Sequence, residues 1–316
     1  MRICVLGGAG FVGRHLVARL ASDRHEIRVV TRKPQRHRAL AVLPGVSMTP
    51  CDVLSVDDLS RVFAECDAVV NLVGILNESR RQTFAEFHIE LVRRIVQAAR
   101  ARQVGRLLHM SALQANVANG PSAYLRSKGE GENIAHTTGK SGIAVTSFQP
   151  SVIFGPDDSF FNRFAQLLRI APGVLPLACP QARFAPAFVG DVAEVMARSL
   201  TDARTHARRY PLCGPRSYSL RELVRYTARV TGRPRWVVGL NDTGSRLQAR
   251  LFERIPGKPF TMDNYLSATV DSVCADNGFA EFGISPVGIE AIVPDYLTTR
   301  GADRHRYHSM RGRARR

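Results

Sequence analysis

The chain has 316 residues, 45% of them hydrophobic, enough for a full core in one large domain or two joined domains. No apolar run reaches the roughly eighteen residues of a membrane-spanning helix. The net charge of +17 favours an anionic partner, such as a nucleotide, a lipid surface, nucleic acid or an acidic protein, without choosing among them.

The six cysteines are scattered, with no CxxC pair and no metal-ligand spacing. This distribution argues against a disulfide framework and against a zinc site, and it favours a reducing compartment. Their positions are Cys4, Cys51, Cys66, Cys179, Cys213 and Cys274.

Strand-like apolar runs alternate with amphipathic helical stretches through the first half of the chain. The expected strands are RICVLG, EIRVVTR, VSMTPCDV, DAVVNLVG, RLLHMSA and IAVTSFQPSVIFG, with helices from about residue 11 and over about 83–102. This alternation is typical of βαβ units around a parallel sheet. It predicts a doubly wound, Rossmann-type α/β fold.

After residue 155 the pattern loosens, with helices expected near 159–170, 191–201, 219–231 and 244–255. We expect a sheet domain, a smaller and mostly helical substrate lobe, and a basic disordered tail. The expected bounds are 1–155 with 184–200 for the sheet domain, 156–183 with 201–300 for the lobe, and 301–316 for the tail.

The first strand runs into GGAGFVG, which fits both GxGxxG (Gly8, Gly10, Gly13) and GxxGxxG (Gly7, Gly10, Gly13). Glycines allow a tight turn, close approach of the backbone to a pyrophosphate and close packing of helix on strand. The amino end of the following helix offers free N–H groups to phosphate. A strand before and a helix after this loop favour a dinucleotide site over a merely structural turn.

The second strand ends in VVTRKPQRHR, without the acidic residue that would bind the ribose 2′-hydroxyl of NAD(H). Arg32 and Lys33 stand there instead, with Arg36 and Arg38 behind them. Because cations suit a 2′-phosphate, the sequence favours NADP(H) over NAD(H). A solvated basic loop is the alternative.

The ends of the third and fourth strands carry further candidate contacts. Asp52 and Val53 fall where adenine contacts belong, and Val73 with Gly74 fall where the nicotinamide ribose belongs.

The segment SAYLRSKGE places Tyr124 four residues before Lys128, in a chain with 40 arginines and only four lysines. Ser111 follows the fifth strand, so these three side chains can converge at the carboxyl edge of the sheet. The lysine would favour the ionised tyrosine and hold the ribose, the tyrosine would exchange a proton with the substrate oxygen, and the serine would orient it.

This combination resembles the short-chain dehydrogenase/reductase superfamily in its atypical and extended branches. The segments HMSALQAN (109–116), AYLRSKGEGE (123–132), QPSVIFGPDD (149–158) and FVGDVAEVM (188–196) look like the family of the NADPH-binding accessory subunit of respiratory complex I and its bacterial relatives. The similarity extends to ARLFERIPGKPFTMDNYL (249–266). It implies a tightly held NADP(H) with a structural or redox-sensing role.

The resemblance also implies roles by position. The pyrophosphate would lie on Gly7, Gly10, Phe11, Val12 and Gly13. Arg32 and Lys33 would hold the 2′-phosphate, and Asp52 and Val53 would flank adenine. The nicotinamide end would be surrounded by Val73, Gly74, Tyr124, Lys128 and Pro150, with Ser111 facing the substrate.

Two function classes remain open. The first is an NADP(H)-dependent oxidoreductase acting on a carbonyl or hydroxyl substrate that is quinone-related or lipid-like. The second is a non-catalytic NADPH-binding accessory or redox-sensing subunit of complex I. The arginine-rich tail lacks a reader motif, which argues against nucleic acid.

Three other stretches have competing interpretations. The apolar face of SFFNRFAQLL favours core packing over an isoprenoid or acyl lining. Arg246, Arg250 and Arg254 suggest a cytoplasmic protein attached peripherally to the anionic inner face of the inner membrane, against a plain solvated surface. His88 and His109 are expected to be structural rather than metal ligands.

Overall fold

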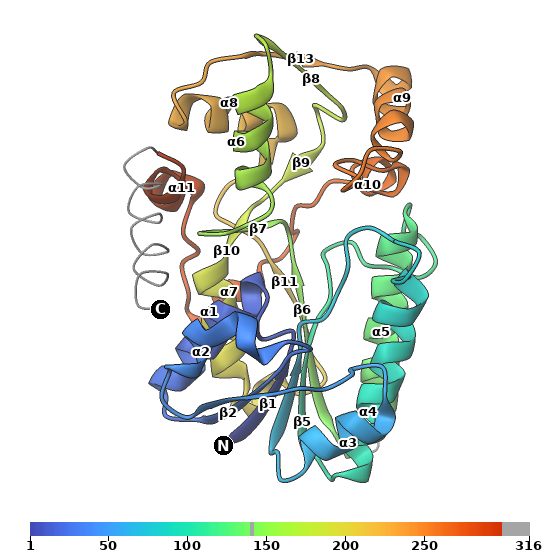
Figure 1. Ribbon diagram of the computed structural model, residues 1–316, viewed down its shortest axis with the longest axis vertical. Helices are drawn as coiled ribbons and strands as arrows, with labels where there is room; N and C mark the ends of the chain where they lie inside the picture. Colours follow the sequence, from blue (N-terminus) through green and yellow to red (C-terminus); the bar gives the residue numbers. More distant parts are fainter. Residues whose placement is uncertain (140–141, 299–316) are drawn as a thin grey trace. The chain divides into compact units, whose positions relative to one another are not determined.

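The computed structural model describes residues 1–139 and 142–298, which form two compact units (Figure 1). Unit 1 comprises Met1–Pro150, Gly190–Leu212 and Asp276–Ile284. Unit 2 comprises Ser151–Val189, Cys213–Ala275 and the described residues from Ser285 onward. The predicted tail of residues 301–316 lies outside the described residues.

Unit 1 is built on a parallel sheet of seven strands in the order β11-β6-β5-β4-β1-β2-β3, as far as the structure is described. The strands are β1 (Arg2–Leu6), β2 (Glu26–Val30), β3 (Val46–Thr49), β4 (Ala68–Asn71), β5 (Arg106–Met110), β6 (Ala144–Pro150) and β11 (Arg209–Leu212). Every residue of β4 and β5 is buried, as helices covering both faces of a sheet require. The doubly wound α/β prediction is confirmed; β11 was not predicted.

The helices of unit 1 cover both faces of the sheet (Figure 1). One face carries α1 (Phe11–Ser22), α2 (Arg38–Ala41) and α7 (Val189–Ser199), and the other carries α3 (Val56–Phe63), α4 (Leu91–Ala101) and α5 (Ala123–Gly139). A π-helical turn, η2 (Ala85–Glu90), leads into α4, so the helix predicted over 83–102 is present with this irregular start. Phe63, Ile95 and Leu107 belong to the core between the sheet and α3, α4 and α5.

Unit 2 has more helical than strand residues, in line with the predicted helical lobe, and its described strands form separate pairs. The strand pairs are β7 (Ile153–Phe154) with β10 (Ala187–Phe188), β9 (Arg183–Phe184) with β12 (Tyr218–Ser219), and β8 (Val174–Leu177) with β13 (Trp236–Gly239). The helices are α6 (Phe161–Ile170), α8 (Leu220–Val230), α9 (Asp242–Phe252), α10 (Met262–Ser267) and α11 (Ile289–Leu297). The core-packing interpretation of SFFNRFAQLL is confirmed, since Phe161 and Leu168 are fully buried in two apolar clusters.

A disulfide joins Cys213 to Cys274 within unit 2. The prediction from cysteine spacing was wrong for this pair. The two cysteines lie 61 positions apart along the chain, so only the tertiary structure shows that they meet.

Candidate functional site

The glycine-rich turn after β1 is organised around the carbonyl oxygen of Gly7. Gly7 has a φ of +77°, which a side chain would strain, and its oxygen accepts a hydrogen bond from the Gly10 N–H at 2.9 Å. A Cβ added to Gly13 would lie 2.4 Å from the same oxygen. Of the two registers that the sequence allowed, Gly7, Gly10 and Gly13 therefore form the turn.

The glycine-rich turn leads directly into the amino end of α1. Gly10 is the N-cap residue and makes no side-chain cap in the described structure, and the first helical turn, beginning with Phe11 and Val12, has no acidic residue. The N–H groups of this turn and the positive end of the helix dipole suit an anion. The residues present therefore fit the pyrophosphate of a dinucleotide.

The turn lies where the strand order reverses, because β1 pairs with both β2 and β4. Asn71 at the end of β4 is buried, and its Oδ1 accepts the Val73 N–H at 3.1 Å. A Cβ on Gly7 would lie 3.2 Å from the Val73 nitrogen, and a Cβ on Gly74 would lie 3.9 Å from Lys128 Nζ. The structure thus gathers these predicted residues at one edge, where α/β sheets bind ligands.

Lys128 is buried in α5, with only 4% of its surface exposed. Its Nζ donates a hydrogen bond to the Met110 carbonyl at the end of β5, at 2.5 Å. Burial lowers the pKa of Lys128 to about 8, while the carboxylate of Glu132 opposes the shift. An ammonium so placed loses its proton more easily than a solvated one, stays mostly protonated at neutral pH, and interacts strongly with nearby charge.

Tyr124 lies one helical turn before Lys128 on the same face of α5. Its half-buried ring meets the rings of Phe84 and His88 edge-on, with centroids 5.9 and 5.5 Å apart. His88 accepts the Ile75 N–H at Nε2 (3.1 Å) and bonds Ser127 Oγ at Nδ1 (2.9 Å). Burial, helped by the charge of Lys128, lowers the pKa of His88 to about 3, so a neutral imidazole supports the tyrosine.

The Ser111 hydroxyl is not available to donate a hydrogen bond to a ligand, because it donates to Glu132 Oε2 at 2.6 Å. Glu132 is 2% exposed and also accepts from Gln149 Nε2 at 2.9 Å and Arg209 Nε at 2.9 Å. Glu132, Gln149 and Asn71 were not predicted from the sequence. Polar residues at buried positions were the available signal, because a buried polar group needs a partner.

Of the two histidines expected to be structural, His88 has a hydrogen-bond partner at each ring nitrogen and His109 at one. His109 is buried on β5 and bonds Asn71 Nδ2 through Nδ1 at 3.2 Å, and its Nε2 has no partner within the described part of the chain. Burial lowers its pKa well below the ordinary value. Among residues 1–139 and 142–298, no cluster of three His, Cys, Asp or Glu could hold a metal.

The remaining predicted residues lie at the same carboxyl edge of the sheet. Val53 and Val73 both pack, partly buried, against the core of unit 1. Asp52 accepts the Leu54 N–H at 3.0 Å through Oδ1. Pro150 is buried at the end of β6, and its carbonyl accepts the Leu113 N–H at 3.0 Å.

Residues 3–213 match the model of the NAD dependent epimerase/dehydratase family. The chain belongs to this family. Over 294 residues it is 26% identical to the rat mitochondrial NADH dehydrogenase (ubiquinone) 1 alpha subcomplex subunit 9, covering 90% of this chain and 77% of the relative. Over 250 residues it is 28% identical to the ceramide reductase of Caulobacter vibrioides, covering 77% and 74%. The resemblance stated from the sequence is confirmed.

A solved structure of similar fold is the NADPH-dependent quinone oxidoreductase of Escherichia coli complexed with NADPH. It has a TM-score of 0.75 and 16% identity, over 93% of this chain and 99% of that one. This epimerase/dehydratase-family chain therefore has an NAD(P)-binding fold. Its Arg32 and Lys33 have exposed side chains just after β2. In the described residues, no helix is long and apolar enough to cross a membrane.

Proposed function

We propose that the protein is an NADP(H)-dependent oxidoreductase acting on a carbonyl or hydroxyl group of a quinone-related or lipid-like substrate. The observation that carries the proposal is the buried Lys128, one helical turn from Tyr124 and beside Gly74 at the edge that holds the glycine turn. The names of two similar proteins, a ceramide reductase and a quinone oxidoreductase, support the substrate class.

The candidate site residues would have separate roles in cofactor binding and proton transfer. A bound nicotinamide would supply or accept the hydride. The glycine turn and the first turn of α1 would bind the pyrophosphate, and Lys128, which has three donors and uses one on Met110, would bind the ribose. Tyr124 would exchange a proton with the substrate oxygen. Ser111 would only accept a hydrogen bond from the substrate, because its hydroxyl already donates to Glu132 Oε2.

Hydride transfer tests this proposal directly. Purified protein would be supplied with NADPH and a panel of quinones, ketones and enones. Tyr124→Phe is expected to lower kcat about 10²-fold or more while NADPH still binds, since a positioned proton donor contributes that much. Tyr226→Phe, which removes a hydroxyl bonded to the Ile289 carbonyl in unit 2, serves as the control. Absence of turnover across the panel would count against catalysis.

The preference for NADP(H) depends on Arg32 and Lys33. Titration of the protein freed of cofactor should show tighter binding of NADPH than of NADH. Arg32→Asp should reduce that preference about tenfold, the typical value of a hydrogen bond to a charged group. Arg102→Asp makes the same charge change at an exposed position after α4 and should leave the preference for NADPH unchanged. Equal affinities in the wild type contradict the proposal.

The second candidate is a non-catalytic NADPH-binding accessory or redox-sensing subunit associated with respiratory complex I. It is favoured by the similarity to the alpha subcomplex subunit, which spans 90% of this chain. Slow exchange of bound NADPH and normal host function with Tyr124→Phe would support it. Rapid oxidation of bound NADPH by a physiological substrate would exclude it.

We also propose a cytoplasmic protein attached peripherally to the anionic inner membrane through α9. Arg246 pairs with Asp242 at 3.0 Å and lies over the Tyr265 ring, so Arg250 and Arg254 would carry most of the attraction. Flotation with anionic vesicles should fall with salt and with Arg250→Gln/Arg254→Gln. Because disulfides are uncommon in the cytoplasm, the thiol state of Cys213 and Cys274 in freshly lysed cells is a second test of location.

A further inference from the structure

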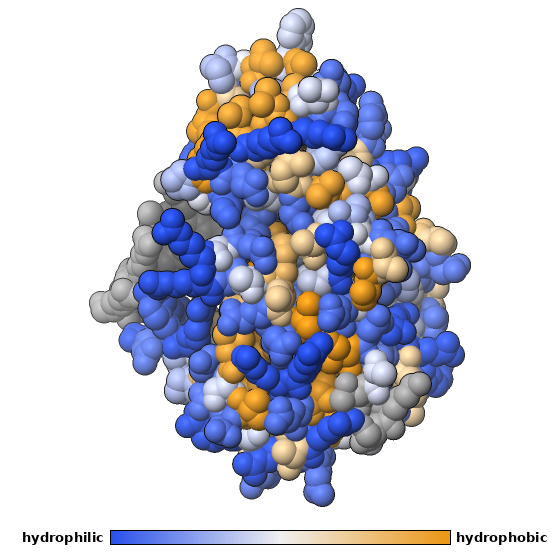
Figure 2. All heavy atoms as spheres, turned by 90° about the vertical axis from the view of Figure 1, so that its right-hand side faces the viewer, coloured by the Kyte–Doolittle hydropathy of each residue, from blue (hydrophilic) through white to orange (hydrophobic). Residues whose placement is uncertain are grey.

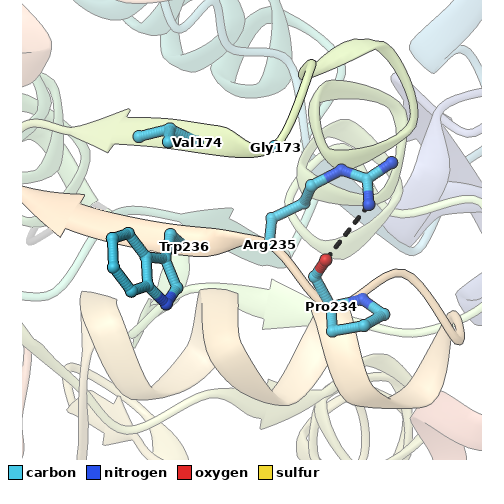
Figure 3. Close-up of a pocket in the computed structure, with 5 residues that line it drawn as sticks. All are labelled: Gly173, Val174, Pro234, Arg235 and Trp236. Atoms are coloured by element: carbon cyan, nitrogen blue, oxygen red, sulfur yellow. Dashed lines mark hydrogen bonds between the residues drawn. The ribbon is translucent and has the colours of Figure 1, made fainter.

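Unit 2 exposes an apolar sheet face that neither the core nor the cofactor site uses. The parallel pair β8 and β13 sets Val174 beside Trp236 (Figure 3). The same register sets Pro176 beside Val238. Side chains alternate along a strand, so these four lie on one face. Trp236 is 80% exposed, Val174 47% and Val238 46%.

The opposite face of this small sheet packs inward. Leu175 and Val237 join an apolar cluster with Leu168 and Val224. The register of both strands is therefore set by the core, and the exposed face is a consistent feature of the unit. Ile170, 72% exposed at the end of α6, adds to the apolar surface of this segment. An exposed contiguous apolar patch usually marks an interaction site.

The chain around this face carries arginine and no carboxylate. Residues 159–190 and 223–241 contain no Asp or Glu. Arg235 is held at the sheet, where its Nε donates to the Ala171 carbonyl at 3.0 Å and its Nη1 to the Pro234 carbonyl at 3.1 Å (Figure 3). The neighbouring Arg169 and Arg233 are exposed. Figure 2 shows apolar side chains gathered at the upper end of the view, with hydrophilic side chains beside them.

We propose that the β8–β13 face inserts shallowly into the surface of an anionic membrane. Tryptophan favours the boundary between headgroups and acyl chains, and arginines beside it would pair with anionic headgroups. A protein partner fits less well, because two strands of four residues span only about 13 by 10 Å. A stable protein interface needs about 800 Å² per partner. The proposal rests on the membrane location given above, but it assigns the contact to a different surface from α9.

Trp236 is the single tryptophan of the chain, so its emission, excited selectively over that of the tyrosines, reports on this face alone. The full chain would be mixed with vesicles of phosphatidylethanolamine and phosphatidylglycerol. We expect emission to shift to shorter wavelength, quenching by lipids brominated on the acyl chain, and binding that persists in part at high salt. Phosphatidylcholine vesicles should produce none of these changes.

Variants separate this face from α9. Val174→Ser/Val238→Ser keeps the fluorescent probe and should weaken vesicle binding about tenfold through lost apolar burial. Val42→Ser changes a valine of unit 1 that is 82% exposed and should have no effect. Arg250→Gln/Arg254→Gln should weaken binding without removing the fluorescence shift.

The outcomes distinguish the two proposals. Vesicle binding with unchanged, unquenched tryptophan emission would overturn the insertion of this face and leave attachment through α9 standing. Absence of binding at any salt concentration would overturn both. A fluorescence change that depends on protein concentration and not on lipid would show that a second copy of the chain covers the face, and would also overturn the proposal.

Discussion

The two units differ in how their strands are joined and in how many ionisable side chains they bury. Unit 1 buries Lys128, His88 and Glu132 beneath a continuous seven-stranded sheet. Unit 2, in its described residues, has three two-stranded sheets and a disulfide, and it leaves Trp236 in solvent. A continuous sheet brings side chains from several strands and helices to one place, where they can supply the partners that buried ionisable groups need.

If the backbone of unit 1 positions the candidate site, a side chain added in the glycine turn should cause the largest loss of stability. Gly13→Ala would place a Cβ 2.4 Å from the Gly7 oxygen and 2.5 Å from the Gly8 Cα, both backbone atoms. We expect a loss of about 5 kcal/mol in the free energy of unfolding or failure to fold, together with loss of cofactor binding. Gly105→Ala, where nothing lies within 4 Å, is the matched control for chemical denaturation. Equal free energies of unfolding for the Gly13→Ala and Gly105→Ala variants would show that close packing at the glycine turn does not stabilise unit 1.

The buried imidazole of His88 should make unit 1 sensitive to acid. The pKa of His88 is about 3 in the folded protein and 6.5 ordinarily. Between these pH values the imidazole is protonated in the unfolded chain and neutral in the folded one. Stability is fully present above pH 6.5 and should fall by about 5 kcal/mol as the pH drops from about 6.5 to 3. Denaturation at several pH values should show a flatter slope for His88→Gln. Identical slopes would mean that other groups control the acid transition.

The covalent link should matter most for unit 2. Closing a loop of 61 residues is worth up to about 4 kcal/mol in the chain-entropy model. Reduction, or Cys213→Ser, should therefore lower the unfolding temperature of unit 2, followed by differential scanning calorimetry. Cys179→Ser changes a free, half-buried cysteine of the same unit and provides the control. An unchanged transition after reduction would show that apolar clusters alone hold the unit.

The smallest expected effect concerns the buried ammonium. Because the folded pKa of Lys128 is about 8, below its ordinary 10.5, the cost of burying the charge is fully present below pH 8 and is relieved as the pH rises towards 10.5. Relative to Lys128→Met, the wild type should gain about 3 kcal/mol over that interval. Chemical denaturation of both proteins between pH 7 and 10.5 measures the difference. A constant difference would show that the ammonium is solvated rather than buried.

Local sequence patterns predicted much of the candidate site. The turn at Gly7, Gly10 and Gly13 and the spacing of Tyr124 and Lys128 involve residues within one or two helical turns, where backbone geometry alone determines the relation. The partner of Ser111 could not be predicted, since the bonds of Glu132 join α5 to β5, β6 and β11. The sequence predicted that Ser111 would orient the substrate, but not that its hydroxyl donates to Glu132.

The sequence by itself determined the alternation of strands and helices, the glycine turn and the family, because each depends on short-range pattern. Only the tertiary structure decided that Lys128 is buried, that Cys213 meets Cys274 and that Trp236 faces solvent. Those outcomes depend on neighbours brought together from distant parts of the chain, and burial, pKa and exposure are properties of that assembled environment.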